Sequence, residues 1–376
     1  MRAKLEIING LRGFAILAVV WHHLFGLYFK TGDMARTGGF FLAYGWIGVQ
    51  LFFVLSGFVL YLPYAQGRAT HGTPAQAWGF YKHRAARLLP LYYFASLLCL
   101  VMNQAPPTGE KLGAELLSIG FVLFPFVDHG FEPWLNPPLW SLGVEIWFSI
   151  LFPFVVISLR GLGAWRFLAL STAIGCGSRT LGLVWDVLPL SNGLTAHLEV
   201  FAAGMVLAQW HANTAGRPRR LSQPGLVATA GVLVIVASIL AKQTGSAVAA
   251  ILFIDAITLG MALLTAGLLT LRGGLLHATF ANRPIQLIGM MCYSLYIWHQ
   301  PVLRHVFAAD VAPLDGLTRT LPVYLALLVA IGAMSYRFIE FGKVPNWRSL
   351  LPTPAERPAP EPAYPAAAIK PRSEPL

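Results

Sequence analysis

A guanidinium group and an imidazole group share the first apolar stretch of this chain. Arg12 and His23 lie eleven residues apart in LRGFAILAVVWHHLFGLYF, residues 11–29. At about 100° per residue, a helix would place both side chains on one face, about 16 Å apart along its axis. Ionisable groups within a membrane span usually face a bundle interior or a wet cavity and mark a functional site. A snorkelling arginine with an interfacial histidine pair would explain the same residues, and this helix alone does not decide between the two interpretations.

A carboxylate forms the second candidate group. Glu145 lies in PPLWSLGVEIWFSILFP, where Trp140, Ser141 and Glu145 begin a predicted helix after a proline-rich turn. Ser141 and Glu145 are four residues apart and therefore share a helix face. A buried glutamate there could hold a cationic group or act as a general acid or base. The alternative is a glutamate favoured by the helix dipole near an N-terminus, and the spacing alone slightly favours that alternative.

Two further segments carry candidate binding groups. Arg84 and Arg87 lie three residues apart in FYKHRAARLLPLYY, which suits a phosphate-rich ligand, although a positive-inside anchor explains the pair better when it is taken alone. Tyr296 and His299 share a face within SLYIWHQPVL, where His299 would act as a relay or as a packing histidine bonded to a carbonyl. Ser56, in LSGFVL, is interpreted as part of a close helix contact through small residues and not as a nucleophile.

Other charges also fall within or beside apolar segments. Burial of the charges of Glu199, Asp255 and Glu340 in an apolar environment costs free energy unless they are paired or solvated. Arg179 and Arg337 are possible partners for them. For Asp255 and Arg337 no neighbouring residue suggests chemistry, so we expect them to form ion pairs that serve packing.

The composition identifies the class of protein that must position these groups. Hydrophobic residues make up 56% of the chain and charged residues 11%, which excludes an ordinary soluble protein. Recurrent long apolar runs predict an all-α polytopic membrane protein with about ten transmembrane helices. The predicted spans lie near residues 11–29, 40–63, 88–103, 139–159, 164–184, 194–210, 225–241, 248–271, 285–305 and 321–341. Segment 112–127 is predicted to be a re-entrant or external surface element that does not span.

The position of the charges predicts the topology. The net charge of +11 would suggest nucleic acid only if the location of the charges were ignored, so no nucleic-acid partner is expected. Most Lys and Arg fall on the cytoplasmic side if both termini are cytoplasmic, as expected for a protein of the inner membrane. This cytoplasmic group includes Arg68, Lys82, Arg84, Arg87, Arg217, Arg219, Arg220, Arg272 and Arg283. We predict one membrane domain over residues 1–345 and a disordered Pro/Ala-rich cytoplasmic tail over residues 346–376, with no cleavable signal.

Five motifs in order resemble acyltransferase family 3, the integral-membrane O-acyltransferases of bacteria and some animals. The matching segments are NGLRGFAILAVVWHH (9–23), FFVLSGFVL (52–60), KHRAARLLPLY (82–92), PLWSLGVEIWFSILFP (138–153) and CYSLYIWHQPV (292–302), with YRFIE (336–340) as a closing match. Two departures are Asn9, where the family often has Asp, and Ile146, where it often has a second Glu. The fused esterase-like domain of some members is not expected.

The resemblance implies transfer of an acyl group, acetyl by default, from cytoplasmic acyl-CoA to a hydroxyl. The acceptor would be a cell-envelope sugar or a lipid-linked glycan, or alternatively a small metabolite such as a macrolide. His23 would be the general base or proton relay, with a covalent acyl-histidine as an alternative, and Arg12 would bind donor phosphate or polarise the thioester oxygen. Arg84 and Arg87 would hold the CoA phosphates, and Glu145 would orient a reacting group.

The remaining expectations concern ligands and rival functions. Trp140, Ser141, Tyr296 and His299 are the predicted substrate-binding residues. No metal and no permanently bound cofactor are expected, because the donor is itself a substrate and the chain has no zinc-type motif. A proton-coupled secondary transporter is the rival class, because spans that carry His and Glu also suit proton relays. The sequence does not decide the acceptor, the acyl chain length, the side of acylation or the oligomeric state.

Overall fold

The fold is entirely helical in the part of the chain that the structure describes. This computed structural model describes residues 2–28, 43–69, 73–102, 110–214, 221–307 and 313–342. The long helices are α1 (Arg2–Tyr28), α4 (Gly48–Ala65), α5 (Pro74–Met102), α7 (Leu139–Leu162), α8 (Ala164–Trp185), α11 (Pro224–Lys242), α12 (Ala247–Thr270) and α16 (Pro313–Ser335). The shorter ones are α6 (Glu110–Phe121), α9 (Leu188–Asn192), α10 (Leu198–Asn213), α13 (Gly274–Ala281), α14 (Arg283–Met290) and α15 (Cys292–Val306). Single turns are η1 (Gly45–Ile47), η2 (Phe124–Phe126), η3 (Asp128–Gly130), η4 (Thr195–His197) and η5 (Tyr336–Glu340).

Membrane-spanning character follows from helix length and composition. Within the described ranges, 8 helices are long and apolar enough to cross a membrane, and each corresponds to a predicted span. The other two predicted spans, residues 194–210 and 285–305, form shorter helices. Helix α10 has 16 residues, and the second segment is divided at Met291 into α14 and α15, of 8 and 15 residues. These helices are shorter than the roughly 20 residues that a bilayer requires, but interruptions at membrane depth are tolerated where protein surrounds them. The all-α polytopic class is confirmed.

The helix that carries the arginine pair begins earlier than expected. It starts at Pro74 instead of near residue 88, because proline at the first helical position suits a helix start. Arg84 and Arg87 therefore lie inside α5, on neighbouring turns of one face. By contrast, α6 in the 112–127 segment has only 12 residues, which supports the prediction that this segment does not span. The predicted tail, residues 346–376, and the predicted cluster at residues 217–220 lie outside the described residues.

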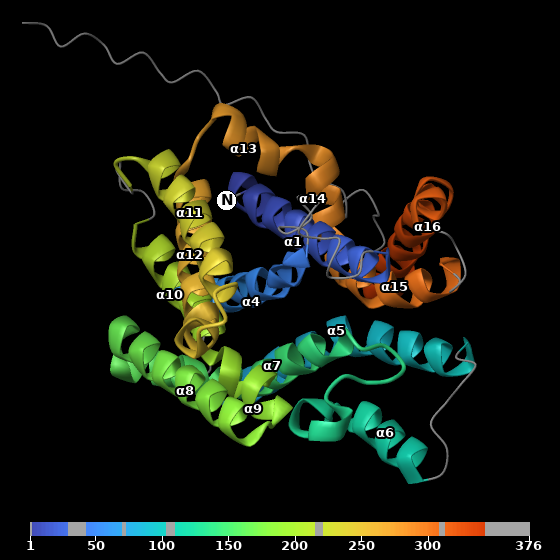
Figure 1. Ribbon diagram of the computed structural model, residues 1–376. Coiled ribbons are helices and arrows are strands. Elements are labelled where there is room, and N and C mark those ends of the chain that lie inside the picture. Colours follow the sequence, from blue (N-terminus) through green and yellow to red (C-terminus); the bar gives the residue numbers. More distant parts are fainter. Residues whose placement is uncertain are drawn as a thin grey trace, which may run out of the picture.

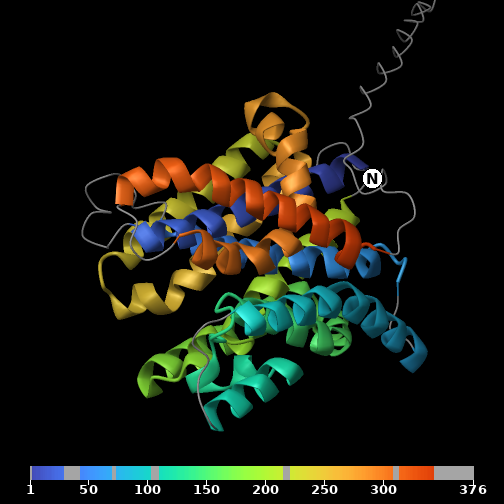
Figure 2. The ribbon, with the colours of Figure 1, turned by 90° about the vertical axis from the view of Figure 1, so that its right-hand side faces the viewer.

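The helices form two layers. In Figures 1 and 2, α5–α9 lie in one layer, and α1 with α11–α16 lies in the other. Helix α4 lies next to the boundary and packs closely on α10. A Cβ atom on Gly57 would lie 2.1 Å from the carbonyl oxygen of Phe201, and one on Gly204 would lie 2.0 Å from that of Val54. These glycines let the two backbones touch, as the small-residue motif predicts, and the contact fixes the face of α4 that presents Ser56.

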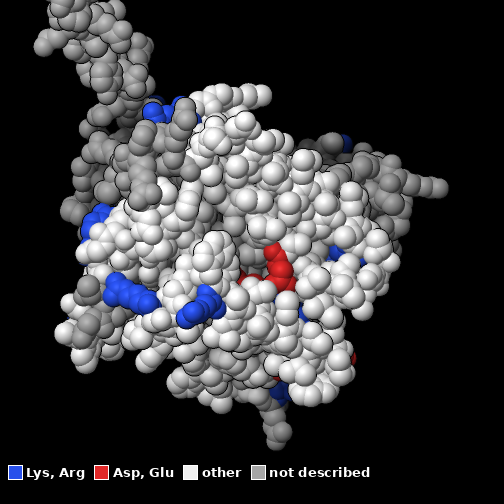
Figure 3. Space-filling view, turned by 90° about the vertical axis from the view of Figure 1, so that its left-hand side faces the viewer, with Lys and Arg blue, Asp and Glu red and all other residues white. Residues whose placement is uncertain are grey.

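The outer surface is apolar over wide areas. Large side chains such as Trp165 and Leu275 are 80% and 87% exposed, respectively. Figure 3 shows a face on which Lys and Arg are few and set apart. Contiguous apolar surface would promote aggregation in water but suits contact with lipid.

Candidate active site

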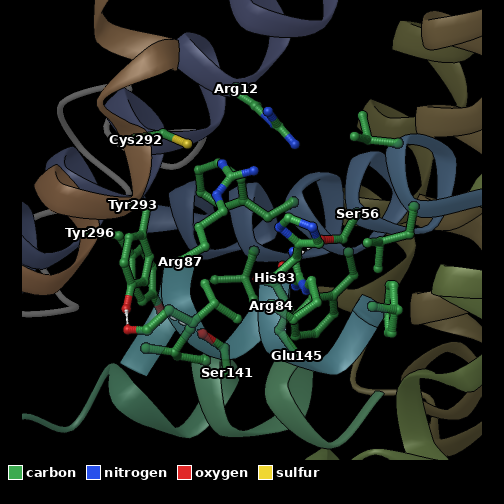
Figure 4. Close-up of a pocket in the computed structure, with 18 of the residues that line it drawn as sticks. Arg12, Ser56, His83, Arg84, Arg87, Ser141, Glu145, Cys292, Tyr293 and Tyr296 are labelled. Atoms are coloured by element: carbon green, nitrogen blue, oxygen red, sulfur yellow. Dashed lines mark hydrogen bonds and ion pairs between the residues drawn. The ribbon is translucent and has the colours of Figure 1, made fainter. Parts of the chain in front are cut away.

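A cavity of about 370 Å³ lies between the two layers. Five elements contribute its polar side chains, which converge from α1, α4, α5, α7 and α15 (Figure 4). The polar and sulfur-bearing lining residues are Arg12, Ser56, Tyr64, His83, Arg84, Arg87, Ser141, Glu145, Cys292, Tyr293 and Tyr296. Ala69, in the connection from α4 to α5, also lines it. This end of the cavity is therefore the side that the charge pattern predicts to be cytoplasmic.

Glu145 lies at the centre of a polar contact between three helices. Arg84 Nη2 donates to Glu145 Oε1 at 2.9 Å, and Ser56 Oγ donates to the same oxygen at 2.6 Å. Arg84 Nε also donates to Ser149 Oγ at 3.1 Å. The contact joins α4, α5 and α7, and the charge of Glu145 neutralises that of Arg84. Glu145 Oε2 takes part in none of these hydrogen bonds.

Arg87 faces a second carboxylate from the opposite end of the chain. Its Nε lies 3.7 Å from Glu340 Oε1, and Ser294 Oγ donates to Glu340 Oε2 at 3.2 Å. The Glu340 side chain is 0% exposed, whereas that of Arg87 is 39% exposed. Arg87 therefore has guanidinium nitrogens to spare on the cavity side of this pair.

Arg12 forms no salt bridge with a described residue, and the carboxylates of Glu145 and Glu340 act on it only from a greater distance. It forms no side-chain hydrogen bond with the described residues either, and its guanidinium points into the cavity (Figure 4). The lining thus contains three guanidinium groups and one glutamate. A cavity with this excess of positive charge at membrane depth suits a ligand with phosphate or carboxylate groups.

A second hydrogen-bonded group closes one wall of the cavity. Ser141 Oγ lies 2.6 Å from the Tyr296 hydroxyl, which itself donates to the carbonyl oxygen of Pro138 at 2.9 Å. Ser141, Glu145 and Ser149 follow one another at one-turn intervals along α7, about 6 Å apart. The wall at Ser141 is therefore about two turns deeper than the Arg84–Ser149 contact.

Two histidines lie directly behind this wall. The rings of Tyr296 and His299 have centroids 5.3 Å apart, and those of His299 and His23 are 4.7 Å apart. Neither histidine lines the cavity. Helix α1 is continuous from Arg12 to His23, so Arg12 lies at the cavity while His23 lies about 16 Å further along the axis.

The structure thus separates the predicted site residues into two groups. The cavity brings together Arg12, Arg84, Arg87, Ser141, Glu145 and Tyr296, while His23, His299 and Trp140 lie outside its lining. Trp140 instead packs against Phe131, with ring centroids 5.6 Å apart. The roles assigned to all nine stay predictions.

Sequence reasoning missed several residues of the site. Ser56 bonds to the central glutamate, and Cys292 and Tyr293 line the cavity. The only signal for them was that all three lie in segments resembling the acyltransferase motifs. Glu340 was noted as a costly charge and as the end of the closing YRFIE match, but its pairing with an arginine of the cavity was not predicted.

The carboxylates at membrane depth are all paired, as their cost requires. Glu199 and Asp255 both bond to Arg179, at 2.5 and 2.6 Å, away from the cavity lining. Arg337 differs, because its one hydrogen bond to a described residue is a long one of 3.5 Å to the carbonyl of Phe341. Among the described residues, no group of three or more His, Cys, Asp or Glu side chains could hold a metal ion.

The long apolar helices and the arginine-lined cavity together define a class of protein: a polytopic helical membrane protein with a cationic cavity between its helices. The family model described as an acyltransferase domain (Acyl_transf_3) matches residues 5–336. The chain therefore belongs to this acyltransferase family, which confirms the family indicated by the motifs.

Curated relatives are similar over nearly the whole chain. A peptidoglycan O-acetyltransferase, OatA, of Listeria monocytogenes is 24% identical over 367 residues, which cover 90% of this chain and 56% of the relative. An O-acetyltransferase, OatA, of Staphylococcus aureus is 26% identical over 371 residues, which cover 89% of this chain and 56% of the relative. The chain thus spans little more than half the length of these relatives. No solved structure matches it.

Proposed function

We propose that this protein is a membrane-embedded O-acyltransferase that moves an acetyl group from cytoplasmic acetyl-CoA to a hydroxyl of a cell-envelope glycan. The observation that carries the proposal is the cationic cavity, in which Arg12 forms no salt bridge with a described residue, within a chain of an acyltransferase family. The name of the Listeria relative, a peptidoglycan O-acetyltransferase, favours a glycan acceptor over a small metabolite.

The cavity suits a phosphate-bearing thioester. Arg12 and the free part of Arg87 supply charged donors for phosphate, while Arg84 is already neutralised by Glu145. Apolar side chains such as Phe52 and Leu60 complete the lining and suit the uncharged arm of the donor. The volume lies at the low end of the range for ligand pockets, so the nucleotide would stay near the α4–α5 connection while the acyl end reaches Ser141.

The chemical step needs a base and a place for the leaving thiol. The acceptor oxygen attacks the thioester carbonyl, a C–O bond forms, the C–S bond breaks, and the CoA sulfur leaves. His23 would take the hydroxyl proton and return it to that sulfur. The acceptor would approach from the His23 end of α1, opposite to the donor, and the two would meet beside the Tyr296 wall. An apolar setting favours the neutral imidazole that this role requires.

Acetyl transfer by the purified protein tests the proposal. With the full chain in lipid nanodiscs, acetyl-CoA and a peptidoglycan fragment as acceptor, we expect free CoA thiol to appear together with acetylated glycan. The control omits the acceptor and measures background hydrolysis. Solute flux in vesicles without consumption of the thioester would instead support a transporter and reject the enzyme.

Replacement of Arg12 by glutamine is expected to weaken CoA binding. A hydrogen bond to a charged group contributes about 1.5–3 kcal/mol, so the Kd for CoA should rise roughly 10–10²-fold. Because Arg12 pairs with no described carboxylate, its loss should leave no ionised partner behind. The measurement is titration calorimetry in nanodiscs with CoA and with pantetheine, which has no phosphate.

The pattern across ligands and variants decides this prediction. Pantetheine should bind equally well to wild type and Arg12→Gln. Arg166→Gln is the matched control, because Arg166 is an exposed arginine of α8 outside the cavity. Unchanged CoA affinity in Arg12→Gln would remove Arg12 from the phosphate site.

A further inference from the structure

His23 and His299 form a pair whose hydrogen bonds determine which ring nitrogens carry protons. His23 Nδ1 lies 2.9 Å from the carbonyl oxygen of Val19, and His299 Nδ1 lies 2.5 Å from that of Tyr296. A carbonyl oxygen only accepts hydrogen bonds, so both Nδ1 atoms must carry a proton. Neutral His299 is then bare at Nε2.

The contact between the two rings follows from this assignment. His299 Nε2 lies 3.3 Å from His23 Nδ1. Because His299 Nε2 has no proton, His23 Nδ1–H is the donor, and it is shared between His299 and the Val19 carbonyl. The proton on Nδ1 leaves His23 Nε2 bare, and Nε2 makes no hydrogen bond to a described residue.

The surroundings of His299 leave its side chain in contact with protein groups only. It is 0% exposed, and both of its ring nitrogens are engaged within the protein. It lies on α15, between the Tyr296 wall and His23, and the Tyr324 hydroxyl donates to its backbone carbonyl at 3.3 Å. A side chain enclosed in this way has no nitrogen left for a substrate but can fix its neighbour.

We propose that His299 is a positioning residue that holds His23 in the tautomer whose Nε2 can accept a proton. The inference rests on the proposed function, in which His23 is the base. When His23 takes a proton at Nε2, it becomes a cation whose Nδ1–H bond to His299 strengthens, since charge-assisted hydrogen bonds are the stronger ones. His299 thus performs, with a neutral acceptor, the orienting task that a carboxylate performs in catalytic triads.

The test compares two replacements of similar size. His299→Leu removes the acceptor, whereas His299→Gln keeps an oxygen able to reach His23. We expect kcat for acetyl transfer to fall about 10–10²-fold in His299→Leu, less than the loss from a wrong tautomer in a triad because the Val19 carbonyl remains. KM for acetyl-CoA should not change, and His299→Gln should recover most of the rate. His305→Leu, a matched change further along α15, should behave as wild type.

A double variant separates positioning from an independent contribution. If His299 acts only through His23, then His23→Ala with His299→Leu should be no slower than His23→Ala alone. An additional loss in the double variant would overturn the proposal. Equal rates for His299→Leu, His299→Gln and wild type would also overturn it while leaving the proposed transferase intact.

A spectroscopic measurement keeps the inference testable without activity. In protein labelled with ¹⁵N-histidine, we expect the His23 signals, assigned by their loss in His23→Ala, to show a protonated Nδ1 and a bare Nε2. His299→Leu should raise the share of the opposite tautomer, and an unchanged spectrum would reject the pairing. If wild type transferred no acetyl, the proposed function would fail, and this spectrum would still decide the tautomer.

Discussion

Replacement of His23 by alanine is expected to lower the rate of acetyl transfer by about 10²–10⁴-fold, the usual contribution of a positioned general base. The side chain is half-buried near the end of α1, and its Nδ1 is already engaged by the Val19 carbonyl and His299. Only Nε2 remains to accept the hydroxyl proton. The measurement is single-turnover transfer of labelled acetyl from acetyl-CoA in nanodiscs.

His22 supplies the matched control for this variant. It is the adjacent residue of the same helix, with a ring centroid 5.2 Å from that of His23 and no place in the cavity lining. His22→Ala should therefore transfer acetyl within a few-fold of wild type. CoA affinity should be preserved in His23→Ala, because the cationic groups of the cavity lie elsewhere: Arg12 is about three turns away along α1, and Arg84 and Arg87 are on α5. A folded His23→Ala protein with the wild-type rate would exclude His23 as the base.

Hydropathy predicted the helical fold and the eight long spans, but it did not predict where an apolar segment is short or interrupted. Residues 194–210 and 285–305 contain apolar runs that resemble a span, because a helix buried in protein and a helix buried in lipid carry similar patterns. Tertiary contact explains the division at Met291. A Cβ on Gly289 would lie 1.7 Å from the carbonyl oxygen of Asn9, so α14 ends against α1 at a point that the local sequence does not mark.

The site was predicted as a set of residues and not as a set of contacts. The family resemblance identified Glu145, but the partner Ser56 lies 89 residues away in another helix. His23 and His299 are separated by 276 residues. Spacing along one helix predicts which residues share a face, whereas it contains no information on which faces of distant helices meet. The hydrogen bonds that determine the tautomer of His23 could therefore not be predicted from the sequence.

Replacement of Arg179 by alanine is expected to destabilise the fold by about 3–5 kcal/mol, the usual cost of leaving a buried charge without its partner. Arg179 bonds to Glu199 at 2.5 Å and to Asp255 at 2.6 Å, and so joins α8 to α10 and α12. Glu199 is 1% exposed, and its Oε2 already has no hydrogen-bond partner among the described residues. The measurement is the unfolding midpoint of the full chain in detergent.

Loss of Arg179 is costly because its single guanidinium compensates two carboxylates, those of Glu199 and Asp255, at membrane depth. Restoring neutrality should therefore recover stability: the triple variant Arg179→Met, Glu199→Gln, Asp255→Asn is expected to unfold close to wild type, because replacing a whole buried ion cluster is often nearly neutral. Arg166→Ala, an exposed change on the same helix, should have little effect. An Arg179→Ala midpoint equal to that of wild type would mean that lipid or water, and not Arg179, satisfies these carboxylates.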